Sequence, residues 1–384
     1  MPPKKRTVED QYRSFTPREH VLNRSGMYIG DMSNVRKPCW VYDEAEKKMV
    51  FKDLTYNPGI CKLFDELITN VLDEAKRDDT LTECKVTFSD EGFVVENNGR
   101  GIQLVEHRVG NCYLPEFLFG KMLTSSNYDD TEQREGAGTN GIGAKAANIF
   151  SKEFEVKIVN NGEEYLQVWR NNMADCTAPK IKKTKSARNY VKITAKPDFA
   201  RFDMENMSSN STQKVLEQRA TEISGLCGKQ VSLSINGKKI STKTFEDYVD
   251  LYLGRDKKAI PRAFAVMDDW QVCIAANPYD DFVQISTVNG CHTRDGGTHV
   301  DLVTRPLCKK IGENLAAKHK DLTVPGKLVE AQLMVFVNTT VPNPKFSSQS
   351  KDQLITPWKD FRNRWPFRCR TWSCRVNSST TLCI

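Results

Sequence analysis

The 384-residue sequence lacks any uninterrupted apolar run near the roughly 20 residues that a membrane-spanning helix requires. It also lacks a secretory signal at its start and any Cys-x-x-Cys pair, although it contains 12 cysteines. Scattered cysteines without a signal are typical of reduced intracellular thiols, and they argue against a disulfide framework or a zinc module. His292 and His299 have no partners at ligand spacing, so no metal site made of protein side chains alone is predicted.

A strong excess of charge of one sign is also absent from most of the chain. The formal net charge is +7, but residues 357–384 contribute +5 of it, which leaves +2 for the remainder. Composition alone therefore does not predict a nucleic-acid-binding surface. The same 28 residues hold three of the six tryptophans and show no amphipathic period. We expect an atypical basic tail there, truncated or frame-shifted, and assign it no function.

Glycine is concentrated in one segment, Gly136-Ala-Gly-Thr-Asn-Gly-Ile-Gly-Ala-Lys145. Such glycines let backbone amides close around an anion, and a helix predicted over residues 144–150 adds its amino terminus, which together indicate a phosphate-binding loop. The segment contains a formal G-x-G-x-x-G, but residues 125–135 before it are polar and acidic, which excludes a dinucleotide-binding fold. Ala144 and Ala146 exclude a P-loop. A flexible linker is the alternative, and the helix that follows argues against it.

A second informative segment, residues 59–77, places apolar residues at the i, i+3, i+4, i+7 spacing of a core-facing helix, with Asn57 as the expected N-cap. Glu66, Asn70 and Asp73 form one polar stripe along its other side. A solvated face would mix lysine and arginine into this stripe, but these residues appear only after it. A carboxylate one turn from an amide can instead activate water and ligate magnesium.

A third segment, residues 93–102, is a strand pattern that ends in an Asn-Asn-Gly-Arg-Gly turn. In chain order, the three segments give E-x-x-x-N on a helix, N-x-G-x-G after a strand, and a glycine-rich loop that enters a helix. This combination resembles the GHKL ATPase fold, which is shared by gyrase, heat-shock 90 chaperones, MutL mismatch-repair proteins and sensor histidine kinases.

Further segments narrow the resemblance to the eukaryotic-type DNA topoisomerase II family. In particular, no other branch of the superfamily carries L-T-S-S-N-Y-D-D together with S-Q-[ST]-K. The supporting segments are residues 24–30 (RSGMYIG), 40–43 (WVYD), 63–66 (LFDE), 123–130 (LTSSNYDD), 140–150 (NGIGAKAANIF), 296–301 (GGTHVD) and 348–351 (SQSK).

The resemblance implies an α+β fold, in which a GHKL (Bergerat) ATPase α/β sandwich is followed by a transducer domain of the ribosomal S5 domain 2-like fold. We expect an N-terminal arm over residues 1–27, the ATPase domain over 28–240, the transducer domain over 241–356 and the tail over 357–384. The expected later elements are strands near residues 154–159, 190–194, 231–235, 270–275, 283–288 and 331–337, and a helix over 299–317.

The same resemblance assigns roles to residues. Glu66 is expected to be the general base that activates water, and Asn70 the magnesium ligand, so ATP and Mg²⁺ are the implied cofactors. Asn97 is expected to contact the adenine amino group, and Lys351 the γ-phosphate from the transducer domain. The other expected nucleotide contacts are Ser125, Ser126, Asn127, Gly138, Thr139, Asn140, Gly141, Ile142, Gly143, Ala144, Lys145, Gln349, Ser350 and Tyr28. Tyr28 would reach the nucleotide of a partner subunit, and a core tyrosine is the alternative.

Several residues depart from the family pattern. Where the family has N-A-A-D-N after the catalytic glutamate, this chain has Val71 and Leu72, which we expect to add bulk beside the nucleotide. Where the family has G-R-N-G-Y-G-A-K, Thr139 replaces the arginine and Ile142 the tyrosine. The loss of one cation near the phosphates predicts weaker nucleotide binding than in relatives.

The predicted function is an ATP-operated gate, in which a homodimer closes around double-stranded DNA. Lys318, His319 and Lys320 correspond to a basic loop that meets the transported duplex in the family, and an ordinary solvated helix end is the alternative. The basic cluster at residues 2–6 resembles a nuclear signal, which predicts a nuclear location if the source is a cell; a viral source is left open.

The resemblance also implies that this chain alone hydrolyses ATP without cutting DNA, because it carries neither the acidic metal-binding domain nor the cleaving tyrosine of the full enzyme. Two alternatives remain open at this point. One is a GHKL chaperone or mismatch-repair ATPase, and the other is an inactive, truncated nucleotide-binding module.

Overall fold

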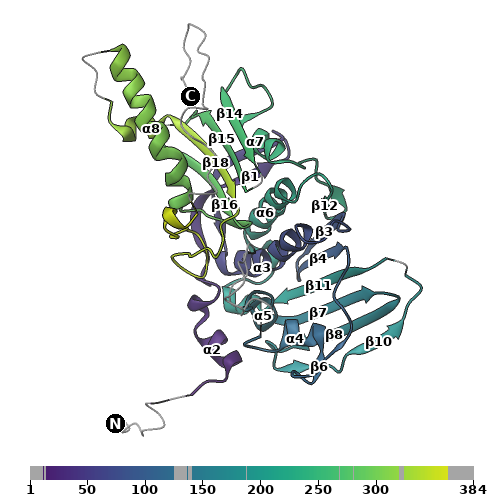
Figure 1. Ribbon diagram of the computed structural model, residues 1–384. Coiled ribbons are helices and arrows are strands. Elements are labelled where there is room, and N and C mark those ends of the chain that lie inside the picture. Colours follow the sequence, from purple (N-terminus) through teal and green to yellow (C-terminus); the bar gives the residue numbers. More distant parts are fainter. Residues whose placement is uncertain are drawn as a thin grey trace, which may run out of the picture.

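A computed structural model describes residues 12, 14–124, 136, 141–186, 188–267, 269–279, 281–319 and 324–361. Within these ranges the chain forms two large sheets, one above the other in Figure 1, with helices packed on each. No described helix combines the length and the apolar character that a bilayer crossing demands.

The first sheet has nine strands in the order β10-β8-β7-β11-β4-β3-β12-β13, with β9 paired to β8. Its neighbours are antiparallel except for β12 and β3, which run parallel. Its central strand β11 alternates buried and half-buried residues, because one face packs on helices. The strands are β3 (Glu83–Ser89), β4 (Gly92–Asn98), β7 (Ser151–Asn160), β8 (Glu163–Arg170), β9 (Asp175–Cys176), β10 (Lys180–Lys183), β11 (Tyr190–Pro197), β12 (Ser232–Ile235) and β13 (Lys238–Lys239).

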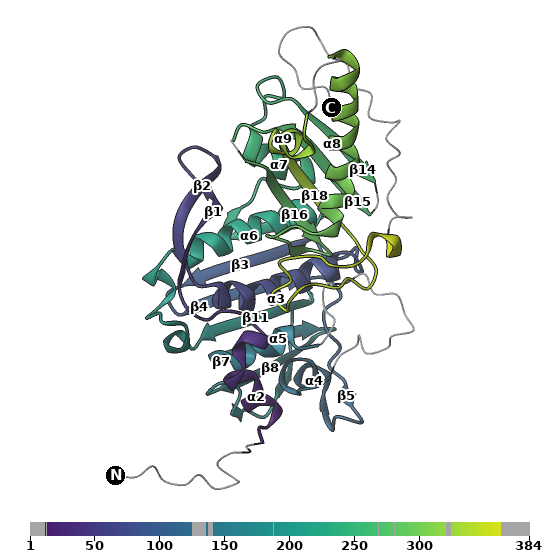
Figure 2. The same cartoon turned by 90° about the vertical axis from the view of Figure 1, so that its left-hand side faces the viewer.

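Three helices, α3 (Pro58–Ala75), α5 (Gly143–Ile149) and α6 (Thr212–Leu226), pack on that face and against one another, with α3 in contact with both others (Figure 2). The apolar residues predicted to face the core do so in α3, from Ile60 to Ala75. The helix begins where Asn57 Oδ1 accepts a hydrogen bond from the Ile60 amide at 3.1 Å, which confirms the expected N-cap.

Smaller elements surround this layer. They are α2 (Pro17–Asn23), α4 (Leu114–Gly120), the pair β5 (Glu106–His107) and β6 (Cys112–Tyr113), and the 3₁₀ turns η1 (Ser25–Met27), η2 (Phe199–Phe202) and η3 (Met207–Ser209).

The second sheet has five strands in the order β14-β15-β18-β16-β17, with β16 and β18 parallel. Residues on both faces of this sheet are buried. Helices α8 and α9 cover one face, and helix α7 covers the other. Its elements are α7 (Phe245–Leu253), β14 (Arg262–Met267), β15 (Trp270–Ala276), β16 (Val283–Val288), β17 (Cys291–His292), α8 (Thr298–Lys318), α9 (Gly326–Ala331), β18 (Leu333–Thr339) and η4 (Trp358–Asp360).

The nine-stranded sheet with its helices is the first half of the molecule, and the five-stranded sheet with its helices is the second half. A hairpin of β1 (Val35–Asp43) and β2 (Lys48–Tyr56) connects the two halves. Met49 belongs to the core cluster of α7 and the second sheet, and the Trp40 ring lies 5.1 Å from that of Tyr252 on α7. The hairpin thus packs against the second half of the molecule while its end, at Tyr56, leads directly into α3.

The expected helices and strands agree with the structure to within about three residues at their ends, and two differences stand out. The last strand begins at Leu333 instead of Ala331, because Ala331 still belongs to α9. Phe361 lies beyond the boundary expected at residue 356, yet it is buried in the second core with its ring stacked on Trp270 at 6.2 Å. The start of the expected tail therefore packs on the second sheet through Phe361, and residues 362–384 lie outside the described ranges.

Candidate active site

Glu66, on the side of α3 that faces α5, is the centre of the candidate site. Its side chain is 11% exposed, and its Oε1 lies 2.7 Å from Lys62 Nζ and 3.5 Å from Lys351 Nζ. Burial raises the pKa of the Glu66 carboxyl, but the two ammonium groups outweigh burial and hold that pKa below its ordinary value. Glu66 is therefore an ionised carboxylate at neutral pH.

Lys351 reaches this carboxylate from the loop that follows β18, and so from the second half of the molecule. Its ammonium is buried; burial lowers its pKa, and the attraction of Glu66 reverses that effect and raises it. The Lys351 backbone has φ +63°, a conformation that non-glycine residues adopt rarely. Its neighbours Gln349 and Ser350 are half-buried, and the Ser350 hydroxyl pairs with that of Ser348 at 2.6 Å.

Helix α5 begins beside the other carboxylate oxygen of Glu66, Oε2. A Cβ atom added to Gly143 would lie 2.0 Å from Glu66 Oε2, so any side chain at this position would collide with the carboxylate. The sequence needs glycine here because of this close approach. Ile142 and Ala144, on either side, are half-buried against the first core.

Lys145, one turn into α5, connects the two ends of the segment that precedes the helix. Its buried ammonium donates to the carbonyl oxygens of Thr124 at 2.8 Å and Gly141 at 2.7 Å. No carboxylate of the described residues pairs with it, and burial lowers its pKa to about 8. Gly141 has φ +61°, a conformation that favours glycine. The expected contacts Ser125, Ser126, Asn127, Gly138, Thr139 and Asn140 lie outside the described residues.

Asn70 follows Glu66 by one helical turn, and its side chain is exposed. Asp73 continues the same side of α3, where a Cβ on Gly136 would lie 3.1 Å from Asp73 Oδ2. The start of the glycine-rich segment therefore lies against the end of the predicted stripe. In the described part of the chain, no group of three or more His, Cys, Asp or Glu side chains could hold a metal ion.

The turn after β4 is held by a residue that the sequence did not reveal. Asp78 accepts hydrogen bonds from the amide of Arg100 at 2.6 Å and from the amide of Thr80 at 2.9 Å. Asn97, half-buried at the end of β4, donates from its amide to the carbonyl of Asn98 at 2.9 Å. No motif distinguishes Asp78 from any other acidic residue near a turn, and only the fold brings it to this loop.

Two other expected contacts lie away from Glu66. The Tyr28 hydroxyl bonds to His20 Nδ1 at 2.9 Å, so in this chain its partner is a residue of α2. Lys318 and His319 are exposed at the end of α8, and Lys320 lies outside the described residues.

Lys62 is a residue of the site that the sequence analysis missed. It extends the polar stripe of α3 by one turn before Glu66, whereas the stripe was defined from Glu66 onward. The i, i+4 spacing of Lys62 and Glu66 is the signal that could have found it.

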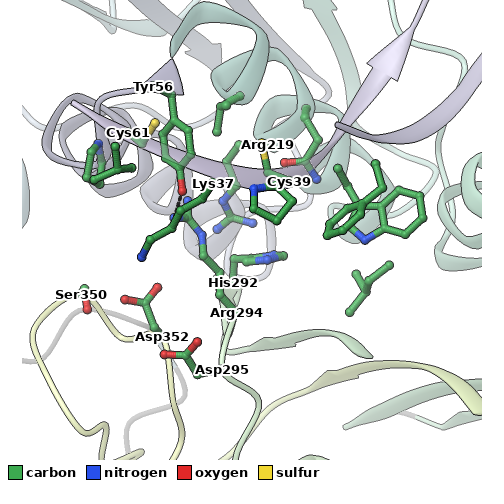
Figure 3. Close-up of a pocket in the computed structure, with 18 of the residues that line it drawn as sticks. Lys37, Cys39, Tyr56, Cys61, Arg219, His292, Arg294, Asp295, Ser350 and Asp352 are labelled. Atoms are coloured by element: carbon green, nitrogen blue, oxygen red, sulfur yellow. Dashed lines mark hydrogen bonds between the residues drawn. The ribbon is translucent and has the colours of Figure 1, made fainter. Parts of the chain in front are cut away.

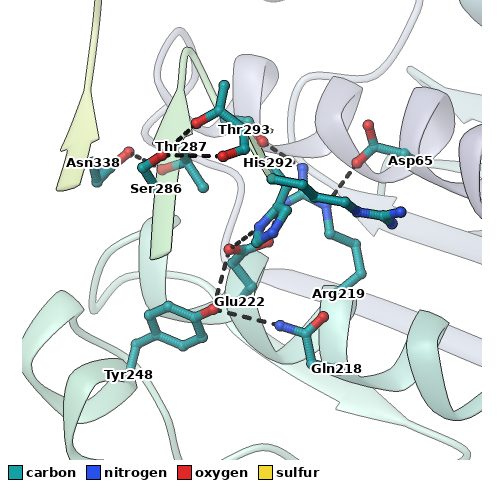
Figure 4. Close-up of polar contacts among 12 residues, drawn as sticks. Asp65, Gln218, Arg219, Glu222, Tyr248, Ser286, Thr287, His292, Thr293 and Asn338 are labelled. Atoms are coloured by element: carbon teal, nitrogen blue, oxygen red, sulfur yellow. Dashed lines mark hydrogen bonds and ion pairs between the residues drawn. The ribbon is translucent and has the colours of Figure 1, made fainter. Parts of the chain in front are cut away.

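A buried polar network joins α3 to the second half of the molecule (Figure 4). The Arg219 guanidinium on α6 contacts Asp65 Oδ1 at 2.6 Å, and it also contacts the Glu222 carboxylate and the carbonyl of Gly290. Glu222 Oε1 lies 2.8 Å from His292 Nδ1 on β17 and accepts from the Tyr248 hydroxyl on α7 at 3.1 Å. Burial raises the pKa of Glu222, but His292 and Arg219 outweigh it and lower that pKa to about 2.

Leu72 also belongs to this joint. Its side chain is buried, and a Cβ on Gly290, in the turn between β16 and β17, would lie 2.4 Å from Leu72 Cδ2. Leu72 belongs to the first core and its Cδ2 end also meets Gly290 of the second half, and the expectation that it adds bulk beside the nucleotide stays a prediction. Val71 is buried in the first core.

A cavity of about 1010 Å³ separates the two halves next to this joint (Figure 3). The β1–β2 hairpin, α3, α6 and β16 line it, and so does the loop that contains Ser350 and Asp352. At its wall, Arg294 donates to the Tyr56 hydroxyl at 3.2 Å, and Lys62 and Asp65 form the edge toward Glu66. The second half of the molecule thus contacts α3 through a few polar groups instead of a continuous apolar interface.

The fold of this chain also occurs in known proteins. The ATPase region of Saccharomyces cerevisiae topoisomerase II has the same fold, with a TM-score of 0.85, 36% sequence identity and 93% of each chain covered. The chain belongs to the DNA topoisomerase II family. The ATPase and transducer domains of DNA topoisomerase II from Balamuthia mandrillaris agree, with a TM-score of 0.87, 37% identity, and coverage of 93% of this chain and 92% of that one.

Sequence comparisons locate this chain within the topoisomerase II relatives. It is 37% identical to DNA topoisomerase 2 of Saccharomyces cerevisiae and of Pisum sativum over 93% and 94% of its length, but it spans only about a quarter of those proteins. The model of the DNA gyrase B family matches residues 242–361. The chain therefore corresponds to the ATPase region of the family, and the expected fold class, an ATPase layer followed by a transducer, is confirmed.

Proposed function

We propose that this chain is the ATP-binding and ATP-hydrolysing gate of a type II DNA topoisomerase. One observation carries the proposal: the buried carboxylate of Glu66 contacts Lys351 from the second half of the molecule and the first residue of α5, Gly143. The proposed base, Glu66, is thus in contact both with the glycine-rich segment and with Lys351, which can sense the nucleotide from the transducer. The predicted boundary between the two domains, near residue 240, stays a proposal.

In the proposed reaction, Glu66 accepts a proton from water while the water oxygen bonds to the γ-phosphorus. The bond from that phosphorus to the β–γ bridging oxygen breaks, and ADP and phosphate are the products. The lowered pKa of Glu66 keeps it ionised, and therefore able to accept the proton, at neutral pH. Lys351 would leave Glu66 for the γ-phosphate when ATP binds, which couples nucleotide binding to the position of the transducer.

The residues fit a magnesium nucleotide. Asn70 offers an exposed amide oxygen one turn from Glu66, and magnesium is commonly held by one or two protein oxygens together with phosphate oxygens and water. That ion would neutralise charge on the phosphates. Asn97 would contact adenine, and Gly141 to Lys145 the phosphates, with the Lys145 ammonium exchanging the carbonyls of Thr124 and Gly141 for phosphate oxygens.

We further propose that two copies close around a DNA duplex when they bind ATP, in the nucleus if the source is a cell. Exposed basic side chains in the middle of α8, Lys309 and Lys310, and at its end, Lys318 and His319, support a duplex contact. Tyr28 would exchange its bond to His20 for the nucleotide of the partner subunit. This region alone is proposed to hydrolyse ATP without cleaving DNA.

Sedimentation of the chain with a non-hydrolysable ATP analogue and Mg²⁺ tests the gate. ATP can close the dimer only if it binds the closed form better than the open monomer, so the analogue should convert monomer to dimer and ADP should not. A chain that binds the analogue and stays monomeric at every concentration would contradict the gate.

A further inference from the structure

Lys62 is a buried lysine with an unusual set of contacts. Its side chain is 6% exposed, and its ammonium lies 2.7 Å from Glu66 Oε1 and 3.8 Å from Asp65 Oδ2. Both carboxylates belong to its own helix. A buried ammonium is costly unless it is paired, so its position has to be explained by one of these two contacts.

Asp65 does not explain it. The Arg219 guanidinium already contacts Asp65 at 2.6 Å, which is a much closer pair than the 3.8 Å contact from Lys62. The charge of Lys62 is therefore directed at Glu66.

Glu66 thus has two ammonium partners on the same oxygen, and they differ in origin. Lys351 belongs to the loop after β18, and under the proposed function it transfers to the γ-phosphate. Lys62 stands one turn before Glu66 on α3, so its distance from the carboxylate does not depend on the transducer. When Lys351 leaves, Lys62 remains.

The second carboxylate oxygen is confined on its own side, because Gly143 leaves no room for even a Cβ beside Oε2. Lys62 Nζ, which lies 2.7 Å from Oε1 as an ion pair without hydrogen-bond geometry, and the start of α5 beside Oε2 together restrict the rotation of the carboxylate. A general base must hold its oxygen within hydrogen-bond distance of the attacking water, so this restricted orientation is what catalysis requires.

We infer that Lys62 is a positioning residue for ATP hydrolysis, which holds the Glu66 carboxylate oriented toward water after Lys351 has moved to the nucleotide. The inference rests on the proposed role of Glu66 as the base. Lys62 acts through Glu66 and makes no contact with ATP in this account, so it should affect turnover and leave nucleotide affinity unchanged.

The test compares Lys62→Met, which removes the charge and keeps the length, with Lys62→Arg, which restores a cation. Lys48→Met is the matched control, because Lys48 has a 2.7 Å ion pair with Glu46 that is half-exposed and far from the site. For each variant we would measure kcat and KM for ATP, the dissociation constant of a non-hydrolysable analogue, and the melting temperature.

General-base catalysis contributes roughly 10²–10⁴-fold, so we expect Lys62→Met to lower kcat by about tenfold or more. The analogue should bind within about twofold of wild type, Lys62→Arg should recover part of the loss, and Lys48→Met should match wild type. If Lys62→Met fails to fold, Lys62→Gln takes its place with the same expected split between kcat and affinity.

The fall of kcat at acid pH gives a second readout. The charges of Lys62 and Lys351 lower the pKa of the Glu66 carboxyl, and the charge of Asp65 raises it. Loss of Lys62 should therefore raise the pKa of Glu66. Glu66 then protonates at higher pH, so the fall of kcat should move to higher pH in Lys62→Met.

A folded Lys62→Met with wild-type kcat, or with a raised KM and unchanged kcat, would overturn the inference. The proposed function fails separately, if Glu66→Gln hydrolyses ATP as fast as wild type.

Discussion

Replacement of Arg219 by alanine should destabilise the chain far more than loss of a comparable surface pair. Arg219 is 9% exposed, and it contacts Asp65 on α3, Glu222 on its own helix and the Gly290 carbonyl of the second half. Its removal leaves two buried carboxylates with fewer cationic partners. Breaking a buried pair in this way costs about 3–5 kcal/mol.

Arg170→Ala is the matched control, because Arg170 pairs with Glu153 at 2.9 Å while its side chain is 49% exposed. Such surface pairs contribute about 0–1 kcal/mol. The assay is urea denaturation of both variants followed by tryptophan fluorescence. The fluorescence sums six tryptophans, among them the buried Trp169 of the first sheet and Trp270 of the second, so one common transition would show that both halves unfold together.

The double variant Arg219→Ala, Asp65→Asn tests the origin of the effect. Because the two residues are in direct contact, their free-energy costs should not add, and the double variant should be less destabilised than the sum of the single ones. A loss for Arg219→Ala no larger than that for Arg170→Ala would refute the view that this network holds α3 to the transducer.

Three further results are expected. Leu72→Ala should cost about 2–5 kcal/mol of unfolding free energy, because its side chain is buried against Gly290, and it should leave analogue affinity unchanged; tighter binding would mean that Leu72 does crowd the nucleotide. Thr139→Arg should lower the dissociation constant for ATP by restoring a cation to the loop, and a rise measured by calorimetry would contradict this. The stability that Glu222 supplies should be complete above its ordinary pKa of 4.5 and lost as the pH falls toward about 2, so Glu222→Gln should flatten the pH dependence of the unfolding free energy in that range.

The sequence was sufficient where function depends on local pattern. The apolar period of α3, its N-cap Asn57 and the glycine at 143 each follow from residues close in the chain, and the structure has them as expected. The placement of Glu66 on the helix followed from the same pattern. Its approach to Lys351, 285 positions away, came only through the family resemblance.

The parts that escaped prediction depend on packing between distant segments. Leu72 could be recognised as larger than its family counterpart, but only the fold shows that it meets Gly290. Asp78 acquires its role by facing the Arg100 amide across a turn. Phe361 lies in a segment of atypical composition, and its burial on Trp270 depends on the second core being assembled.

Steady-state ATP hydrolysis by the purified chain, with Glu66→Gln as its partner, tests the central claim most directly. The amide has nearly the shape of the carboxylate but cannot accept the proton from water. We expect magnesium-dependent phosphate release by wild type, and a loss of about 10²-fold or more in Glu66→Gln, which should still bind the non-hydrolysable analogue. No phosphate release by a wild-type chain that binds the analogue, or equal release by both proteins, would contradict the account.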